Sequence, residues 1–340
     1  MRSIAAALLV TVPALAACSQ PTASVPSLAS FGNGALSEGV PAKKSAARAY
    51  WTLFYAGADP QVEIAKLPLK PSSKVTDVDG TAGNELVCAN AIRFVGDKVW
   101  IMNLSPCHGS GSSIVQVYAL PLKTTSKPQN AFTLSGPMDA DHMTFDASGD
   151  LWVSSYGNNA VYEYTGPFTT SGTLEPATTL TTDIDTPQGL GFDSKGNLYV
   201  ANAGSSGSQA IAVFKAPIAN RKPYFLKGVS GPAGLTFDAS GDLFVSSNAT
   251  VGAIAEYVSN DLKSGDKPTV VDKTGIAANP YGSDLSFDAA GNLYDADCGG
   301  TPGIYSYPTA TKKFASNLSP SFFTDGSVTS IGCVWGIALH

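Results

Sequence analysis

The chain has few charged residues and few histidines, and these scarcities disfavour several classes of protein. Only 14% of its 340 residues are charged, and three are histidine. Almost no segment has the apolar spacing of an amphipathic helix, which disfavours a helical fold. The formal net charge is −6 and no basic patch is present, which argues against a nucleic-acid partner.

Two motifs of catalytic and metal-binding proteins are missing. No Cys-x-x-Cys pair or histidine cluster occurs, which disfavours a zinc site. No Gly-x-Ser-x-Gly elbow accompanies the histidines, which disfavours a serine hydrolase.

The chain does contain one sequence motif, here called the repeated phrase, in four copies. Each copy runs apolar-polar-Phe-Asp, then a turn with Gly followed by Asp or Asn, then Leu and an aromatic residue. The repeated phenylalanines are spaced by 47, 45 and 50 residues, at Phe145, Phe192, Phe237 and Phe287. A period in this range is typical of propeller blades or solenoid units.

Each copy predicts two short strands around a tight turn. Asp can bond the turn backbone and Gly can take the positive φ that closes the turn. A third strand follows each copy, at residues 160–164, 210–214, 253–257 and 303–307, and then a weaker fourth strand. Four strands in each repeat is the pattern of a propeller blade.

Two weaker copies raise the count to six. One covers residues 90–94, 98–102 and 114–118. The other is split, with its first strand at 335–340 and its outer strands at 50–55, 62–67 and 74–78. The sequence therefore predicts an all-β, six-bladed β-propeller, closed by a C-terminal innermost strand and three N-terminal strands in one blade. A stacked solenoid is the alternative, but a solenoid does not require complementary partial repeats at the two ends of the chain.

The N-terminus predicts an exported protein. A basic start and a short apolar run end in Leu-Ala-Ala-Cys18, which resembles the bacterial lipobox. The resemblance implies cleavage before Cys18, a lipid on its sulfur, and attachment to the membrane of the bacterial cell envelope. An ordinary secretory signal is the alternative. We expect a signal peptide at 1–17, a Ser- and Pro-rich flexible tether at 18–45 and the propeller at 46–340.

The other four cysteines predict disulfides, since an even number in an exported protein favours pairing. By the repeat alignment, two precede an innermost strand and two follow a second strand, and these loops share one face. We predict the pairs Cys88–Cys107 within a blade and Cys298–Cys333 between neighbouring blades.

The repeat alignment also predicts a polar ring at the channel mouth, where the innermost strands begin. His142 and Asp284 occupy equivalent positions three blades apart, so they should face each other across the channel. The candidate ligand-binding residues at the mouth are Asn90, Asn103, Gln188, Asp284, Asp297 and Trp335. Asp141 also lies in this ring, and Ser155, Asn202 and Ser247 end second strands on the same face. The Asn and Asp side-chain oxygens of this ring are suitable ligands for Ca²⁺ or Mg²⁺. Alternatively, these polar side chains form hydrogen bonds with loop backbone and with water in the channel.

Asp141 and His142 are the candidate catalytic residues, because His142 beside Asp141 could act as a base. The four Asp-x-x-Gly turns lie on the opposite face. They lack the spacing and the terminal Glu of an EF-hand, and we expect plain turns.

The repeated phrase resembles NHL repeats and the gluconolactonase-like (SGL) propellers. The resemblance implies a divalent cation held by a Glu, two Asn and an Asp at the channel mouth. Asp141 matches the Asp and Asn90 one Asn, so these two are the candidate metal ligands. Trp335 stands at the second Asn and Ala233 at the Glu, so half of the implied ligand set is missing.

The expected function is an envelope-anchored propeller lipoprotein that binds a small molecule or an envelope protein without a certain cofactor. One alternative is a divalent-metal hydrolase of the lactonase type that uses Asn90 and Asp141. A second is an enzyme resembling virginiamycin B lyase, for which His142 is the only well-placed base.

Overall fold

The computed structural model describes the chain from residue 47 to 340, with gaps at 55–61, 71, 79–85, 87, 106–111, 205–208, 250–252, 259–261, 274–281, 300–301 and 325–332. The predicted signal peptide, tether and Cys18 lie outside the described residues and remain predictions. No helix in the described part is long and apolar enough to span a membrane.

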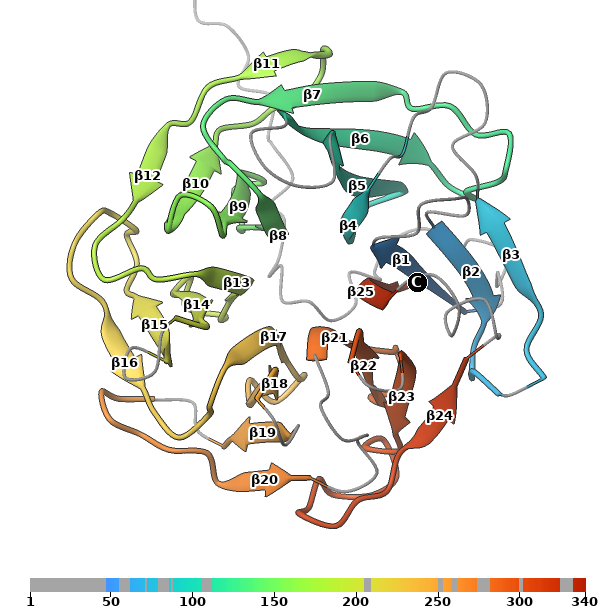
Figure 1. Cartoon of the computed structure of the whole chain (residues 1–340), viewed down its shortest axis with the longest axis vertical. Coiled ribbons are helices and arrows are strands. Elements are labelled where there is room, and N and C mark those ends of the chain that lie inside the picture. Colours follow the sequence, from blue (N-terminus) through green and yellow to red (C-terminus); the bar gives the residue numbers. More distant parts are fainter. Residues whose placement is uncertain are drawn as a thin grey trace, which may run out of the picture.

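The described strands form six small sheets around a central axis, as the blades of a propeller (Figure 1). From the axis outwards, blade 1 has β4 (Ala89–Val95), β5 (Lys98–Ser105), β6 (Ser112–Ala119) and β7 (Asn130–Leu134). Blade 2 has β8 (Ala140–Phe145), β9 (Leu151–Ser155), β10 (Ala160–Tyr164) and β12 (Thr178–Leu180). Blade 3 has β13 (Pro187–Phe192), β14 (Leu198–Asn202), β15 (Ala210–Phe214) and β16 (Tyr224–Leu226).

The remaining blades follow the same order. Blade 4 has β17 (Pro232–Phe237), β18 (Leu243–Ser247), β19 (Ile254–Tyr257) and β20 (Val270–Asp272). Blade 5 has β21 (Gly282–Phe287), β22 (Leu293–Asp297), β23 (Gly303–Tyr307) and β24 (Ser321–Phe323). Blade 6 joins β25 (Cys333–Leu339) to β1 (Arg48–Phe54), β2 (Val62–Lys66) and β3 (Val75–Val78).

The predicted split blade is confirmed. β25 is innermost and pairs antiparallel with β1, with Tyr50 opposite Ala338. Two backbone bonds between Arg48 and His340, of 2.7 and 2.9 Å, fasten the C-terminus to the first strand. Closure of this kind pairs the ends of the chain instead of leaving an open sheet edge between the first and last blades.

One strand was not predicted. The chain between β10 and β12 forms β11 (Gly172–Leu174), which pairs in parallel with β7 and becomes a fifth strand of blade 1. The Ser135 N–H donates to the Leu174 carbonyl at 2.9 Å and continues this pairing. Three residues carry too little pattern to mark a strand, and the open outer edge of β7 supplies the partner.

Aromatic pairs between neighbouring blades explain why the phrase repeats. At five of the six contacts between neighbouring blades, the aromatic residue of the second strand meets the repeated Phe of the next blade edge to face, with ring centroids 4.9 to 5.7 Å apart. The pairs are Trp100–Phe145, Trp152–Phe192, Tyr199–Phe237, Phe244–Phe287 and Tyr50–Phe94. Such pairs add about 0.5–1.5 kcal/mol each beyond their buried area.

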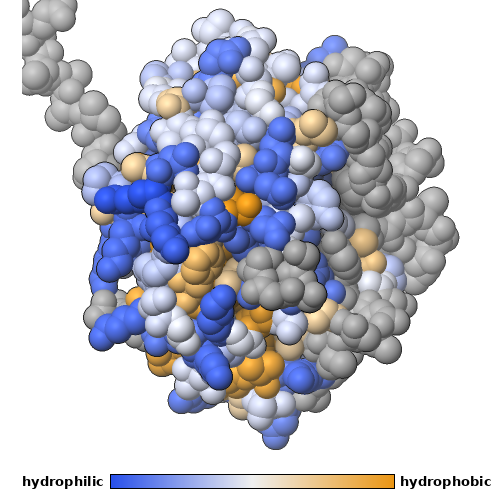
Figure 2. Space-filling view, turned by 60° about the vertical axis from the view of Figure 1, so that its left-hand side comes forward, coloured by the Kyte–Doolittle hydropathy of each residue, from blue (hydrophilic) through white to orange (hydrophobic). Residues whose placement is uncertain are grey.

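On the face that Figure 2 shows, hydrophilic and intermediate residues surround smaller hydrophobic areas. The exposed large hydrophobic residues of the described chain are Met138, Tyr156 and Val258.

Candidate site at the channel mouth

Bulges shape the ends of the innermost strands at the mouth. In blade 2 the pairing of β8 with β9 shifts register between Ala140 and Met143, which leaves Asp141 and His142 outside the regular ladder. The His142 N–H donates instead to the Ser154 hydroxyl at 3.0 Å. A bulge of this kind bends the strand and re-aims its side chains.

Asp141 lies between two partners from different blades. The Trp335 indole N–H donates to Asp141 Oδ1 at 3.0 Å, and His142 Nδ1 lies 3.1 Å from Asp141 Oδ2. Asp141 is 7% exposed, whereas His142 is 1% exposed. Both carboxylate oxygens therefore already have partners within the protein.

Several charges act on the pKa of His142. Burial lowers that pKa most, but the charge of Asp141, its hydrogen bond and the charge of Asp284 together outweigh burial, so the pKa lies above 6.5. The charge of Arg93 acts in the opposite direction. Asp141, His142, Asp284 and Arg93 thus form one interacting polar cluster in the channel, which agrees with the facing positions expected for His142 and Asp284.

A buried ion pair joins blades 1 and 5 within this cluster. Arg93 Nη1 lies 2.7 Å from Asp284 Oδ2, and Nη2 lies 3.1 Å from Oδ1, so the pair is bidentate. Asp284 is fully buried and also accepts the Ile337 N–H at 3.2 Å. Arg93 was not among the predicted site residues, although a lone arginine between apolar residues of an innermost strand could have indicated it.

Asn90 connects blade 1 to blade 2. Its Nδ2 donates to the Ala140 carbonyl, next to Asp141, so the two predicted metal ligands occupy neighbouring places. Asn90 is 1% exposed, and its Oδ1 has no hydrogen-bond partner in the described part of the protein.

Side chains at the ends of the second strands form hydrogen bonds with backbone groups of the loops. Asn103 Oδ1 accepts the Cys88 N–H at 2.8 Å, and Asp297 Oδ1 accepts the Gly299 N–H at 2.5 Å. Asn202, Ser155 and Ser247 bond neighbouring loops in the same way. This is the capping role that we named as the alternative to ligand binding.

Gln188 is also buried at this end. Its Oε1 lies 3.3 Å from Asn248 Nδ2, which extends from the neighbouring blade. The side chain therefore contributes to the contact between blades 3 and 4.

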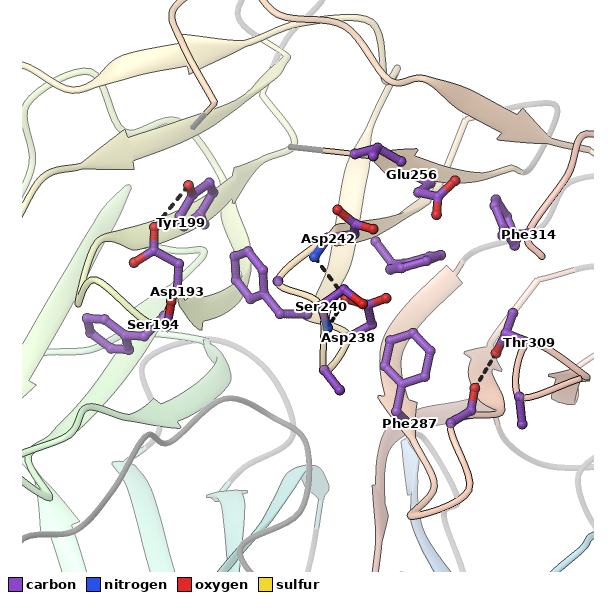
Figure 3. A pocket seen from close by; sticks show the side chains of 18 of the residues that line it. Asp193, Ser194, Tyr199, Asp238, Ser240, Asp242, Glu256, Phe287, Thr309 and Phe314 are labelled. Carbon is purple, nitrogen blue, oxygen red and sulfur yellow. Dashed lines mark hydrogen bonds between the residues drawn. The ribbon is translucent and has the colours of Figure 1, made fainter. Parts of the chain in front are cut away.

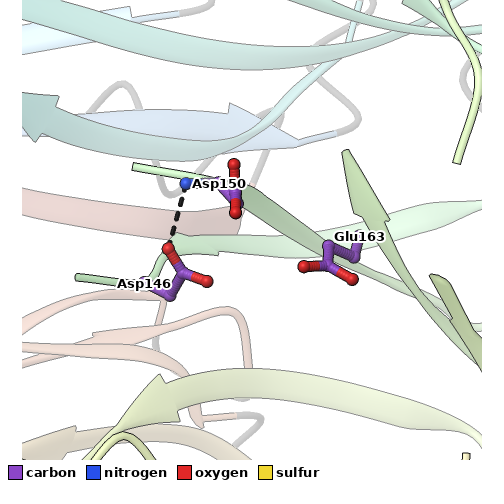
Figure 4. A group of neighbouring side chains, drawn as sticks. All are labelled: Asp146, Asp150 and Glu163. Atoms are coloured by element: carbon purple, nitrogen blue, oxygen red, sulfur yellow. Dashed lines mark hydrogen bonds between the residues drawn. The ribbon is translucent and has the colours of Figure 1, made fainter. Parts of the chain in front are cut away.

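The mouth does not match the cation site that the family resemblance implies. The indole N–H of Trp335 is a donor and cannot ligate a cation, and it occupies Asp141 Oδ1. Among the described His, Cys, Asp and Glu side chains, three ligating atoms come within 4.8 Å of one another only at Asp146, Asp150 and Glu163, at the far end of blade 2 (Figure 4).

The disulfide predictions fall partly outside the described residues. Cys88 and Cys298 both lie in the cluster that includes Trp335, at the mouth end of blades 1 and 5. Cys107 and the side chain of Cys333 are not described, so the two pairings remain predictions.

Comparison with known proteins supports the fold alone. No family model matches the chain, and no curated protein matches it. A Bacteroides fragilis protein described as a 6-phosphogluconolactonase is 12% identical, covers 89% of this chain and 100% of its own, and has a TM-score of 0.58. A Trichoderma reesei carbohydrate-active enzyme of family AA12 is 13% identical over 75% of this chain and 93% of its own, with a TM-score of 0.52.

The comparison also touches the lyase alternative. Virginiamycin B lyase from Staphylococcus aureus is 18% identical over 71% of each chain, with a TM-score of 0.46, which is too low to support an argument about activity.

Proposed function

We propose that the protein is a lipid-anchored propeller of the bacterial cell envelope that binds a small molecule or an envelope protein at the channel mouth. The observation that carries this proposal is the occupation of Asp141, whose two oxygens face the Trp335 indole N–H and the His142 ring. These two contacts hold the carboxylate in place, and with 7% of its surface exposed Asp141 offers little open access to a substrate or a cation.

Exposed apolar side chains at the same end of the propeller favour docking. Met138 precedes β8 and is 39% exposed, and Tyr156 follows β9 and is 49% exposed. Backbone bonds of 3.0 and 3.1 Å, from Tyr156 to Asp139 and from Gly157 to Met138, hold the two loops together. Amphipathic aromatic residues on a rigid support are typical of binding surfaces.

A relationship to the NHL and SGL propellers is part of this proposal, and it keeps a second function open. Asn90 Oδ1 is a buried acceptor without a described partner beside Asp141, which favours a divalent-metal hydrolase of the lactonase type. The cation would share the Asp141 carboxylate with the Trp335 indole N–H. A lyase with His142 as its base has less support, because this ring is 1% exposed and contacts Asp141.

Metal analysis and a lactone-hydrolysis screen of the purified protein separate the two functions. Binding without catalysis predicts no stoichiometric divalent metal and no turnover, with Asp141→Ala indistinguishable from the parent in both. Stoichiometric metal and turnover that are both lost in Asp141→Ala would overturn the proposal and establish the hydrolase.

The envelope assignment has its own test. The protein should fractionate with membranes and carry a lipid on Cys18, and Cys18→Ser should release it. Non-reducing digestion and mass spectrometry should recover the Cys88–Cys107 and Cys298–Cys333 peptides. A parent protein that fractionates like Cys18→Ser would contradict the anchor.

A further inference from the structure

A cavity of about 940 Å³ lies at the end of the propeller opposite the mouth, where the turns of blades 3, 4 and 5 meet. Five acidic side chains line it against two lysines, Lys195 and Lys313. In Figure 3, Asp238 and Asp242 lie in the middle of the lining, between Tyr199 and Phe314. The cavity is therefore both acidic and aromatic.

The turn of blade 4 differs from its counterparts in one hydrogen bond. In blades 2, 3 and 5, Oδ2 of the turn aspartate accepts a bond from the aromatic residue of the second strand. The donors are Trp152 to Asp146 at 3.2 Å, Tyr199 to Asp193 at 3.2 Å and Tyr294 to Asp288 at 3.3 Å. In blade 4 this aromatic residue is Phe244, which has no donor.

Asp238 consequently has one engaged oxygen. Its Oδ1 accepts the backbone N–H groups of Ser240 and Asp242, both at 2.9 Å. Its Oδ2 accepts no hydrogen bond from a residue that the structure describes. Asp242 stands where blades 3 and 5 carry Asn197 and Asn292, so it adds a carboxylate to this turn.

A third acidic side chain faces the same place. Glu256 on β19 pairs with Phe244, is 5% exposed and lines the cavity. Its Oε2 is buried without a hydrogen-bond partner in the described chain. Blades 3 and 5 carry Val213 and Ser306 at this position.

The charges around Glu256 are unbalanced. The pKa of Glu256 is raised to about 7, mainly by burial; the charges of Asp242 and Asp238 also raise it, and the charge of Lys313 lowers it. Lys313 forms no ion pair with Glu256 within the described residues. A buried carboxylate of this kind is costly unless a cation faces it.

Blade 2 offers an internal comparison. It carries the equivalent acids Asp146, Asp150 and Glu163 (Figure 4). There, however, Trp152 bonds Asp146, and Glu163 does not line the cavity. The atoms of that group lie within 4.8 Å of one another, whereas those of Asp238, Asp242 and Glu256 form no such compact group. The blade 4 acids thus suit a cation larger than a metal ion.

From these observations we infer that this cavity binds a small organic cation, an ammonium or guanidinium group on an apolar body. The cationic group faces Glu256 and Asp238, and the apolar body lies against Phe287 and Phe314. Charge-assisted hydrogen bonds hold the cation, and aromatic walls favour a cationic ligand over a neutral one. This site is separate from the mouth and does not depend on the function proposed there.

Calorimetric titration with phenethylammonium, against its neutral analogue 2-phenylethanol, tests the inference. At pH 8 the cation should bind at least tenfold more tightly than the alcohol. Glu256→Gln should weaken cation binding about tenfold, while the matched Glu163→Gln and the mouth variant Asp141→Ala should leave it unchanged. At pH 6 the parent should bind up to about tenfold more weakly, because most Glu256 is then protonated.

A second variant keeps the charge of Glu256 and changes only the partner of Asp238. Phe244→Tyr places the hydroxyl found in blades 3 and 5 beside Asp238 Oδ2, and should weaken cation binding severalfold. Equal affinity for the alcohol, no binding at millimolar phenethylammonium, or unchanged binding in both Glu256→Gln and Phe244→Tyr would overturn the inference.

Discussion

Replacing Asp295 should stabilise the propeller. Asp295 lies in the middle of β22 and is 1% exposed, where blades 2, 3 and 4 carry the fully buried Val153, Val200 and Val245. Its Oδ1 has no hydrogen-bond partner among the described residues. Burial, followed by the charges of Asp297 and Asp284, raises its pKa well above the ordinary value.

The sign of the pH effect follows from that pKa. The folded state holds the Asp295 proton more tightly than the unfolded state. The protonated side chain therefore makes a contribution to the free energy of unfolding that is fully present below pH about 3.9 and is lost as pH rises through the folded-state pKa. The loss is about 1.4 kcal/mol for each pH unit between the two pKa values. Asp295→Asn should remove this contribution to the slope and keep the shape of the side chain.

Asp295→Val should stabilise the folded protein more than Asp295→Asn does. An unsatisfied buried polar group costs about 1–3 kcal/mol, and a buried Val side chain contributes about 1.5 kcal/mol or more. We expect the free energy of unfolding at pH 7 to rise by roughly 2–4 kcal/mol. For a domain of this size the midpoint temperature should increase by several degrees.

Urea unfolding of the parent and both variants from pH 4 to 8, followed by tryptophan fluorescence, measures these quantities. If Asp295→Val is less stable than the parent, or if Asp295→Asn has the parent's pH slope, the reasoning is wrong. Asp295 would then hold a compensating interaction that its buried position does not reveal.

Three further predictions concern the mouth. Arg93→Met should cost about 3–5 kcal/mol in urea unfolding because it leaves Asp284 buried and unpaired, and adding Asp284→Asn should recover part of the loss. Asp141→Asn should take the pKa of His142 below 6.5, because burial then dominates, and an NMR titration in which this pKa is unchanged would contradict the described contact. Trp335→Phe keeps the ring but removes the donor to Asp141, so it should cost about 1–2 kcal/mol in the same unfolding assay, and an unchanged midpoint would show that the bond contributes nothing.

The sequence was sufficient for the fold because the contacts that hold blades together recur. Phe145 and Phe192 occupy the same place in successive copies, and each meets the aromatic residue of the preceding blade. The short strand β11 could not be predicted, because its partner β7 lies about 40 residues earlier and the pairing depends on an open edge.

The mouth was predicted in position but not in its bonding. The repeat alignment located Asp141 and His142, since register is a property of the repeat. It could not show that Arg93 reaches Asp284 across 191 residues of sequence, or that Trp335 donates to Asp141. Such contacts depend on which side chains meet at the axis, and the spacing within one copy does not determine them.

Acidic residues at the two ends of the propeller differ in whether the protein supplies their hydrogen-bond donors, and departures from the repeat account for the difference. At the mouth, Asp284 and Asp141 find donors in Arg93 and Trp335, which the other copies lack. At the opposite end, blade 4 carries Phe244 where blades 3 and 5 carry a tyrosine, so a hydrogen-bond donor is missing, and Glu256 adds a carboxylate. Because repeated units fold alike, a copy that gives up an internal bond and gains a buried charge is where an external cation is to be expected.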